Sequence, residues 1–585
     1  MTEETWDVVI VGVGLSGLSA AQTLRKRNGK LRILILEGKD RVGGRTVTQE
    51  LPAARGIDRW DMGGQWVGST QTYVMDLIQE FGLEVYTQYT TGKKVHHVGG
   101  PHAKVRTSST SIPALSTLVL LDLSQLVWKI DRLSSTVSVE DPMKSLNAQE
   151  LDSMTLHSYI EKHAWTEEMK EEMGVCSRVV FGMEPNQMSF LYFLMYAAAA
   201  GGVLCLLEST PGSAQEFRVK GGTQQLSERL AQQIGWESVR LGKAVTAIWQ
   251  DDEHAKVMTA THSYLCRAVI VTCPPHLAAK IHYQPALPIQ REHLTQNMPV
   301  GHLITHTHTH THTHTHEKGF SGEIVARPSA ECPLSVTFDG TSPSGSAALV
   351  GFISGVQAYN WSSRELSERR DAVILSLVKY LGEEAASYIH YEEKDWALEE
   401  YSGGCPVNVM APGLLTYYHP SLHTPCGRIH WAGTETATQW CGYMDGAIQS
   451  GQRAALEVRA RLCPFTLTQE EQEAVQAAQN QNHESGPCQP VPSTSHLRRA
   501  LILTTLIMAT AVLLAQPQLC RDWIGQARQV VLRSSTAHFH IASLQQSDRV
   551  PLLIVSHAKS ESQVSMATVR GVLQTRSVST PLNLD

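Results

Sequence analysis

Residues 7–17 read DVVIVGVGLSG, and this stretch decides the fold. DVVIVG is the apolar run of a fully buried strand, and residues 19–26 carry helix-forming side chains directly after the glycines. A second apolar run, LRILILE, ends at Glu37. A strand, a glycine turn, a helix and a second strand in this order predict a βαβ unit at the start of an α/β domain.

The glycines of this unit have the spacing of a dinucleotide site. Gly12 suits the tight turn, Gly14 lets the backbone approach a pyrophosphate, and Gly17 lets helix and strand pack closely. The helix N-terminus then faces the phosphates, with Ser16 in its first turn. Glu37 ends the second strand, where a carboxylate can hold a ribose hydroxyl. The pattern in this context predicts a bound dinucleotide.

A second glycine turn distinguishes between the possible dinucleotides. Gly43 and Gly44 follow Glu37 closely, and Arg45 adds a cation near the diphosphate. A site for free NAD does not need that cation. Together these residues form the pattern E-x-x-x-R-x-G-G-R over residues 37–45.

Further motifs make a family resemblance specific. Residues 61–66 read DMGGQW, residues 399–408 read EEYSGGCPVN, and residues 429–455 read IHWAGTETATQWCGYMDGAIQSGQRAA. Over roughly residues 5–460 the chain resembles the flavin-containing monoamine oxidase family. The resemblance implies a doubly wound FAD-binding domain, a substrate domain on a mixed sheet, and a C-terminal membrane helix in the mitochondrial outer membrane. It also implies oxidative deamination of primary monoamines by O2, with secondary and tertiary amines left open.

The resemblance assigns cofactor contacts residue by residue. Cys405 stands where the family bonds sulfur to the flavin 8α-methyl, which would retain the cofactor and tune its potential. Val245 matches a residue at the adenine, and Trp396 and Met444 stand at flavin-contacting positions. The complete set of expected FAD contacts is Gly12, Gly14, Ser16, Gly17, Glu37, Lys39, Gly43, Gly44, Arg45, Gly63, Gly64, Gln65, Val245, Trp396, Cys405, Gly433, Thr434, Glu435, Gly442, Tyr443 and Met444.

Four positions are expected to act on the substrate. Tyr443 matches one wall of the family's aromatic cage, which orients the amine nitrogen toward the flavin. The second wall falls on Pro406, so one ring is missing. Trp66 replaces a further active-site tyrosine and keeps an aromatic ring there. Thr305 falls on the position of a lysine that the family bonds through water to flavin N5.

Thr305 also begins a repeat of six Thr-His pairs, residues 305–316. Alternation at period two predicts a strand with threonines on one face and histidines on the other. Histidines on one face of a strand can bind a metal ion, but a repeat of this kind fixes no geometry. We therefore expect no specific metal site, and catalysis by this family requires none.

The order of the motifs predicts a chain that returns to the FAD-binding domain twice. The expected FAD-binding segments are 1–95, 219–290 and 396–460, and the expected substrate segments are 96–218, which is mainly helical, and 291–395. A linker is expected over 461–500, an anchor over 501–519, and a disordered tail rich in serine, glutamine and valine over 520–585.

Composition limits the possible partners. The net charge is −7 and there is no long block of basic residues, which argues against nucleic acid as the main partner. Eleven cysteines without short paired spacings indicate neither a disulfide framework nor a zinc site. The uncharged run of residues 501–515, preceded by Arg498 and Arg499, is slightly shorter than a comfortable membrane span and predicts a C-terminal anchor. A homodimer is left open.

Three functions remain compatible with these residues. The first is an active amine oxidase that uses an amine and O2. The second is a flavoprotein of the same fold with weak or no amine oxidation, which Pro406, Thr305 and the repeat favour. The third is an oxidase of polyamines or amino acids, against which the Ser-Gly-Gly-Cys segment of residues 402–405 argues.

Overall fold

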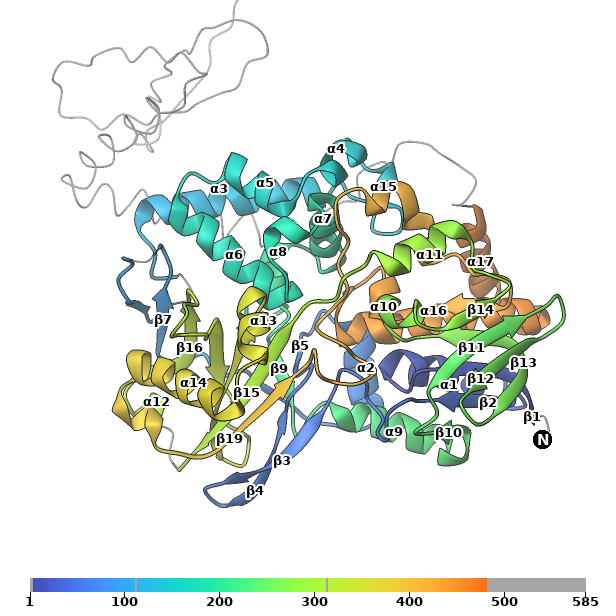
Figure 1. Cartoon of the computed structure of the whole chain (residues 1–585), viewed down its shortest axis with the longest axis horizontal. Coiled ribbons are helices and arrows are strands. Elements are labelled where there is room, and N and C mark those ends of the chain that lie inside the picture. The colour runs from blue at the N-terminus through green and yellow to red at the C-terminus, as the bar shows by residue number, and fades with distance from the viewer. Residues whose placement is uncertain (1–3, 101, 111–112, 312–313, 481–585) are drawn as a thin grey trace, which may run out of the picture. The chain divides into compact units, whose positions relative to one another are not determined.

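Two large sheets organise the chain in the computed structural model, which describes residues 4–480 except 101, 111–112 and 312–313 (Figure 1). The chain crosses between the sheets several times, so each sheet is built from segments far apart in the sequence. The predicted βαβ unit is present at the N-terminus of the first sheet.

The first sheet has eight strands in the order β10-β2-β1-β13-β12-β11-β14, with β20 also paired to β13. Its apolar centre, β10-β2-β1-β13-β20, is parallel, as expected for strands buried on both faces. The strands are β1 (Glu4–Val11), β2 (Ile33–Leu36), β10 (Val239–Arg240), β11 (Val245–Gln250), β12 (Ala255–Thr259), β13 (Ser263–Val271), β14 (His282–Gln284) and β20 (Ile429–Trp431). Helices α1 (Leu15–Arg27), α9 (Gln224–Ile234) and α16 (Met444–Leu462) pack beside it.

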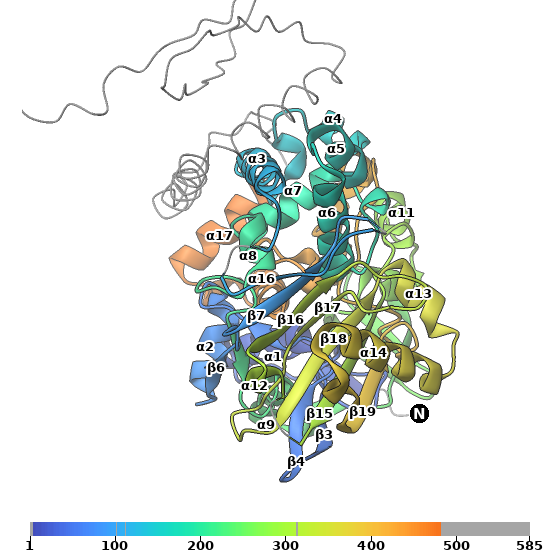
Figure 2. The same cartoon turned by 90° about the vertical axis from the view of Figure 1, so that its left-hand side faces the viewer.

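The second sheet has seven strands in the order β19-β15-β18-β17-β16-β7-β8 and mixes parallel with antiparallel pairs. Its strands are β7 (Lys93–His97), β8 (Arg106–Ser108), β15 (Leu303–His310), β16 (Phe320–Ala326), β17 (Val336–Asp339), β18 (Ala347–Ser354) and β19 (Tyr388–Asp395). Helices α13 (Val356–Ser362) and α14 (Leu366–Leu381) cover one face of this sheet (Figure 2). β7 begins just before the boundary that we expected at residue 95.

The segment expected to be helical forms a cluster of helices beside the second sheet. These are α3 (Thr117–Ser134), α4 (Ala148–Ser153), α5 (Leu156–His163), α6 (Glu167–Phe181), α7 (Phe190–Ala199) and α8 (Val203–Leu207). There are also two small sheets in the described part of the chain. One pairs β3 (Thr48–Ala53) with β4 (Gly56–Asp61), and the other has the order β5 (Trp66–Val67), β9 (Phe217–Val219), β6 (Val85–Thr87). Short helices complete the fold: α2 (Thr72–Glu80), α10 (Pro275–Ala278), α11 (Ile289–Gln296), α12 (His314–Glu317) and α15 (Leu414–Tyr418).

The first half of the Thr-His repeat forms the predicted strand. β15 lies between β18 and β19, and all its residues are buried. Thr307 faces Met62 and Thr309 donates to the Pro52 carbonyl, while His306 and His308 face the other side, beside Tyr391. The second half differs from the expectation, because the repeat leaves the sheet after residue 310 and ends in α12. Residues 312–313 lie outside the described part.

The buried histidine pair makes acid sensitivity an expected property of the fold. His308 Nε2 and His306 Nδ1 share one hydrogen bond of 2.8 Å. Burial lowers the pKa of His306 to about 3 and that of His308 well below its ordinary value. Because an unfolded histidine titrates near pH 6.5, the unfolded state binds more protons below that pH. Stability should therefore fall as the pH drops below about 6.5, by roughly 1.4 kcal/mol per pH unit for each histidine.

This expectation is checked by urea unfolding at pH 7.5, 6.5 and 5.5. The double variant His306→Phe, His308→Val should lose less stability on acidification than the parent chain, whereas His282→Gln, an exposed strand position, should behave like the parent. Equal pH dependence in all three proteins would show that the pair does not control acid sensitivity.

The predicted linker over 461–500 contains the end of α16 and a further helix, α17 (Gln469–Asn480). Thr468 and Glu471 form a capping box: each side chain accepts a hydrogen bond from the backbone N–H of the other residue. Glu471 also pairs with the buried Arg459 of α16, which fixes the start of the helix. None of the described helices is long and apolar enough to cross a membrane, and the expected anchor and tail lie outside the described residues.

Candidate active site

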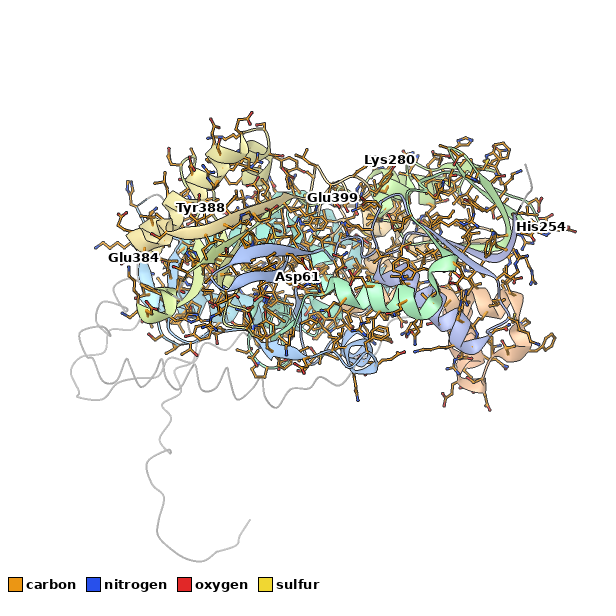
Figure 3. The ribbon with its side chains drawn as sticks, turned by 90° about the horizontal axis from the view of Figure 1, so that it is seen from below. Asp61, His254, Lys280, Glu384, Tyr388 and Glu399 are labelled. Atoms are coloured by element: carbon orange, nitrogen blue, oxygen red, sulfur yellow. The ribbon has the colours of Figure 1, made fainter. Side chains whose placement is uncertain are left out.

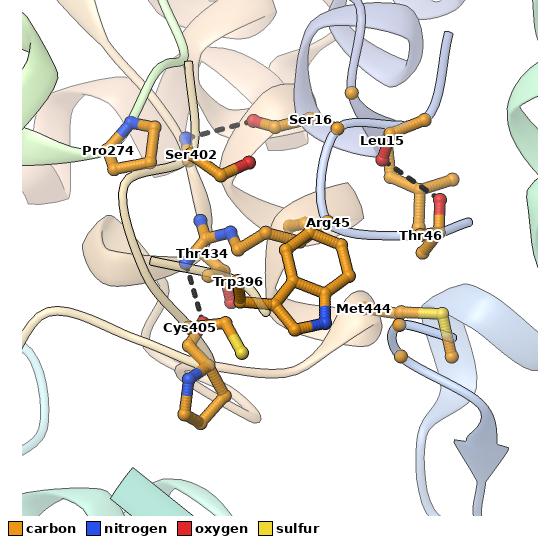
Figure 4. Close-up of a pocket in the computed structure, with 18 of the residues that line it drawn as sticks. Leu15, Ser16, Arg45, Thr46, Pro274, Trp396, Ser402, Cys405, Thr434 and Met444 are labelled. Carbon is orange, nitrogen blue, oxygen red and sulfur yellow. Dashed lines mark hydrogen bonds between the residues drawn. The ribbon is translucent and has the colours of Figure 1, made fainter. Parts of the chain in front are cut away.

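One cavity of about 360 Å³ gathers most of the residues that the motifs singled out (Figure 4). Its walls come from the glycine turns after β1 and β2, from β15 and β18 of the second sheet, and from the segments around Cys405 and Tyr443. The cavity therefore lies where the two sheets meet, and both sheets contribute side chains to it.

The first glycine turn leaves room for a ligand at one position and not at the others. Gly12 has φ +106°, and a Cβ there would lie 2.5 Å from the Thr272 hydroxyl. A Cβ on Gly17 would lie 2.1 Å from the Gly12 carbonyl, so this glycine permits the helix to approach the strand. Gly14 lines the cavity, and a Cβ there would meet no protein atom closer than 3.9 Å. Space at Gly14 fits an approaching pyrophosphate.

The N-terminus of α1 carries no side-chain cap and no acidic residue in its first turn. Leu15 and Ser16 of this turn line the cavity. Free backbone N–H groups and the helix dipole make such an end favourable for an anion. The Ser16 hydroxyl accepts from the Gly433 N–H at 2.9 Å and thereby joins the first glycine turn to the segment after β20.

Two carboxylates organise the nucleotide end of the cavity. Glu37 accepts hydrogen bonds from the backbone N–H groups of Val13 and Lys39 at 2.7 and 3.0 Å. Glu399 lies among Lys39, Arg41 and Lys394. Burial alone would raise the pKa of Glu399, but these three cations lower it to about 2. The cations outnumber the carboxylate, so this corner stays electropositive.

Arg45 is held by a bidentate ion pair with Glu435. The two nitrogen–oxygen distances are 2.6 and 3.0 Å, and the guanidinium also donates to the Pro406 carbonyl at 2.7 Å. Burial would raise the pKa of Glu435, but Arg45 holds it below its ordinary value. The Arg45 charge is thus compensated, and the residue joins the second glycine turn to the segment after Cys405.

Cys405 lines the cavity with a buried thiol. Burial raises the pKa of this thiol, while Arg45 and the Leu303 backbone N–H oppose that effect. Figure 4 shows Cys405 on one side of Trp396 and Met444 on the other. Trp396 is fixed by a 2.9 Å hydrogen bond from its indole N–H to the Met62 carbonyl.

Thr305 lines the cavity, whereas His306 and His308 of the same strand face the other side, beside Tyr391. Thr305 lies in register with Phe352 of β18 and Lys394 of β19. Lys318 cannot replace the missing lysine, because its ammonium pairs with Glu384. Figure 3 places Glu384 at the outer end of the second sheet near Tyr388, away from Glu399.

Aromatic rings form the other walls. The ring centroids of Tyr443 and Tyr196 are 6.0 Å apart, and the ring planes are inclined by 45°. The ring centroid of Trp66 is 5.0 Å from that of Phe338 and 6.0 Å from that of Phe352. Burial raises the pKa of the Tyr443 phenol, so this ring is neutral. All five rings line the same cavity, which gives it an apolar end beside Cys405 and Thr305.

Comparison with known proteins now identifies the family. The flavin containing amine oxidoreductase family matches residues 15–459, which is most of the chain. The chain belongs to the flavin-containing amine oxidases. It is 37% identical over 458 residues to amine oxidase [flavin-containing] A of Bos taurus, covering 78% of this chain and 85% of the relative. It is 36% identical to a probable flavin-containing monoamine oxidase A of Dictyostelium discoideum, covering 78% and 98%.

Solved structures support the same family. A cyclohexylamine oxidase from Brevibacterium oxydans superposes with a TM-score of 0.73 at 31% identity, covering 78% of this chain and 99% of that one. A putrescine oxidase bound to putrescine superposes with the same TM-score at 28% identity and the same coverage. The predicted fold is therefore confirmed as the FAD-binding fold of the amine oxidases with mixed sheets, and FAD is the cofactor of this enzyme.

The flavin-containing amine oxidase brings nearly all the expected site residues to the cavity wall. Gly17 and Glu435 do not line it, because Gly17 serves helix packing and Glu435 holds Arg45. The expected residues that do line it are Gly12, Gly14, Ser16, Glu37, Lys39, Gly43, Gly44, Arg45, Gly63, Gly64, Gln65, Trp66, Val245, Thr305, Trp396, Cys405, Pro406, Gly433, Thr434, Gly442, Tyr443 and Met444.

Several residues of the site carry no sequence signal that we used. Tyr196 lies on the apolar helix α7, and Phe338 and Phe352 lie on strands of the second sheet. Glu399 stands within the motif EEYSGGCPVN, six positions before Cys405, but its partners Lys39 and Arg41 come from a distant segment, so the sequence did not indicate its role. The aromatic residues become visible only when the strands are placed in register.

Proposed function

We propose that this enzyme oxidises primary monoamines with an apolar body. The amine loses two electrons and two protons to become an imine, O2 gains them to become H2O2, and water hydrolyses the imine to an aldehyde and ammonia. Secondary and tertiary amines remain open as further substrates. The charge distribution of the cavity is the observation that carries this proposal.

Among the described residues that line the cavity, only Glu37, Lys39 and Arg45 have charged side chains. Glu37 accepts backbone N–H groups, Lys39 pairs with Glu399, and Arg45 pairs with Glu435. The aromatic end therefore offers no carboxylate for a second ammonium group and no free cation for a carboxylate. An unpaired buried charge is costly, so these features favour a monoamine over a diamine or an amino acid.

The side chains of this end suit binding and orientation of a neutral amine. Tyr443 presents an electron-rich ring face toward the amine nitrogen, and Trp66, Phe338 and Phe352 enclose the apolar body and exclude water. When bound, FAD accepts the two electrons of the oxidation and passes them to O2. No described side chain of this end titrates near neutral pH, so proton transfer is expected to involve the amine itself and water.

The expected FAD contacts are part of the proposal. We assign the α1 N-terminus and Gly14 to the pyrophosphate, Glu37 to a ribose and Val245 to the adenine, and we assign Trp396, Met444 and Cys405 to the flavin. Support comes from the open space at Gly14 and from the position of all these residues on one cavity.

A peroxide assay tests the substrate class. Benzylamine and phenethylamine should each give one H2O2 per amine consumed, whereas putrescine and alanine should give at most a few per cent of that rate. If putrescine is oxidised faster than benzylamine, the proposed substrate class is wrong.

Two changes toward the family pattern should raise turnover. Thr305→Lys restores the ammonium at the cavity wall, and Pro406→Tyr restores the second ring. Because loss of one positioning group costs on the order of 10²-fold, we expect either variant to raise kcat/KM for benzylamine, up to about that factor. The control is Lys318→Thr, since Lys318 pairs with Glu384 away from the cavity and should not affect kcat/KM. If the parent chain is fast and both changes slow it, other residues perform these roles.

An alternative function is a flavoprotein with little or no amine oxidation. The replacement of the lysine by Thr305 and of the cage ring by Pro406 favours it, because both positions line the substrate end of the cavity. Flavin that is retained but not reduced by any amine would distinguish this scaffold from the oxidase.

We also propose a C-terminal anchor over residues 501–519, placed in the mitochondrial outer membrane. The uncharged run after Arg498 and Arg499 supports it. Truncation at residue 495 should release the protein from carbonate-washed membranes. If the full-length chain is already recovered in the supernatant, the anchor does not exist.

A further inference from the structure

The indole of Trp66 is tied to a side chain outside the cavity, Gln88. The Trp66 N–H donates to Gln88 Oε1 at 2.7 Å. Gln88 follows β6 and is almost completely buried. Its backbone N–H donates to the Glu216 carbonyl at 3.0 Å, so the main chain at this position is fixed as well.

The partners of Gln88 determine which way its amide points. Gln88 Nε2 donates to the Asp339 carbonyl at 2.9 Å and to the Tyr89 carbonyl at 3.2 Å. Carbonyl oxygens only accept, so the NH2 group must face them. The amide oxygen must then face Trp66, whose indole N–H can only donate. This network has one consistent arrangement, and it fixes the orientation of the indole.

The fixed indole is one part of an aromatic wall. Trp66 meets Phe338 edge-on, with ring planes at 63°, and Phe352 at 55°. Such inclined contacts between rings are favourable beyond the area they bury. Phe352 lies in register with Thr305, so the wall stands directly beside the reaction end of the cavity. We name these three residues, Trp66, Phe338 and Phe352, the aromatic wall.

Contacts on the outer side hold Gln88 in place. The ring of Tyr89 stacks on His316 at 3.9 Å, and His316 Nε2 lies 2.8 Å from the Asp339 carboxylate. Asp339 is also the residue whose carbonyl accepts from Gln88. The last histidine of the repeat thus helps to clamp the segment that carries Gln88 against the segment that follows Phe338.

We propose that Gln88 is a positioning residue that holds the aromatic wall, and that this wall determines how strongly the enzyme prefers a flat aryl amine over a linear alkylamine. The proposal deepens the proposed amine oxidation and rests on it. A planar ring gains contact only if the indole keeps its angle to the two phenyl rings. A flexible alkyl chain adapts to either orientation.

Removal of the Gln88 amide should therefore change affinity selectively. Gln88→Leu leaves the indole N–H without a partner and frees the ring to turn. We expect KM for benzylamine to rise about tenfold with little change in kcat, because the variant weakens positioning by the order of one hydrogen bond. KM for n-pentylamine should change less than twofold. FAD content should stay close to that of the parent, whereas the urea midpoint of the holoenzyme should fall, because the indole N–H and two carbonyls lose a buried partner.

A double-mutant cycle shows whether Gln88 acts through Trp66. In the Trp66→Phe background, which retains a ring but has no N–H, Gln88→Leu should have no further effect on the benzylamine KM. If Gln88→Leu does not retain FAD, Trp66→Phe alone is expected to give the same tenfold rise in the KM for benzylamine. Two results would overturn the proposal. One is a full tenfold rise in the benzylamine KM on adding Gln88→Leu to Trp66→Phe. The other is an equal rise in KM for benzylamine and n-pentylamine.

Ligands that cannot be oxidised separate this proposal from the proposed function. Cumylamine and 2-methylhexan-2-amine lack a hydrogen on the carbon that bears nitrogen, and their binding is followed by the flavin difference spectrum of the holoenzyme. Gln88→Leu should weaken the binding of cumylamine about tenfold and the binding of 2-methylhexan-2-amine less than twofold. If no amine is oxidised but this difference appears, the oxidase function fails and the role of Gln88 stands. If amines are oxidised and both ligands weaken equally, the role of Gln88 fails and the oxidase function stands.

Discussion

Denatured Cys405→Ser protein is expected to precipitate without colour and to leave all its FAD in the supernatant, whereas the parent protein should retain yellow flavin in the acid precipitate. The Cys405 thiol lines the cavity beside Trp396, where the flavin is assigned. A serine hydroxyl fills the same space but is far less nucleophilic than a cysteine sulfur. The change should therefore abolish attachment and leave the noncovalent FAD site intact.

The surroundings of Cys405 bear on how the bond forms. Burial raises the pKa of its thiol, so in the absence of cofactor the sulfur is protonated near neutral pH. Arg45 and the Leu303 N–H favour the thiolate, which is the nucleophilic form.

The matched control is Cys273→Ser. Cys273 lines the same cavity at its nucleotide end, and its thiol pKa is also raised by burial. This variant should keep the acid-stable yellow colour, and a flavin-bearing peptide should contain Cys405. Release of FAD from the parent protein by acid would contradict covalent attachment, although not FAD binding.

Glu435→Gln is expected to be the most destabilising single change in the site. It removes the buried partner of a bidentate pair and leaves the partly buried Arg45 guanidinium with an uncompensated charge. Breaking a buried pair in this way typically costs about 3–5 kcal/mol. The Arg45–Glu435 pair also joins the second glycine turn to the segment after Cys405, so FAD retention should fall together with stability.

Urea unfolding of the holoenzyme and of apoprotein measures the effect. The control is Glu50→Gln, which breaks the exposed pair with Arg59 and should cost no more than about 1 kcal/mol. The double variant Arg45→Met, Glu435→Met removes both charges and should be less destabilised than Glu435→Gln. Equal small losses from Glu435→Gln and Glu50→Gln would show that the buried pair does not support the site.

The nucleotide half of the site was predictable because its signals are local. Gly12, Gly14 and Gly17 have distinct steric roles within six residues, and the structure shows the close approaches at Gly12 and Gly17 that forbid a side chain. Glu37 follows directly from the end of a buried strand. The approach at Gly17 is local, because a Cβ there would meet the Gly12 carbonyl, whereas a Cβ on Gly12 would meet Thr272 of a distant segment. What the sequence expresses is the spacing of the three glycines directly after a buried strand.

The substrate half depends on register between distant strands. Phe352 reaches the cavity because β18 pairs with β15, and Gln88 reaches Trp66 because β5 and β6 both pair with β9. No spacing within one segment encodes these pairings. The alternation of the repeat predicted a strand with threonines and histidines on opposite faces, but it indicated neither which face lines the cavity nor that the strand ends at His310.

The helix α17 was missed although its capping box is visible in the sequence. Composition rich in glutamine and glutamate suggested a linker, whereas Thr468 and Glu471 stand at the spacing that starts a helix. The composition of the whole segment indicated a linker, and the capping box of two residues was given too little weight.

Anaerobic addition of benzylamine to the purified holoenzyme tests most directly whether this flavin-containing amine oxidase oxidises monoamines at the cavity between its two sheets. We expect that the visible absorption of the flavin bleaches on mixing, that air restores it, and that one H2O2 forms per amine. Bleaching should be slower after Tyr443→Ala, with the FAD still bound. Flavin that stays oxidised with every monoamine, in a protein that binds FAD fully, would contradict the account.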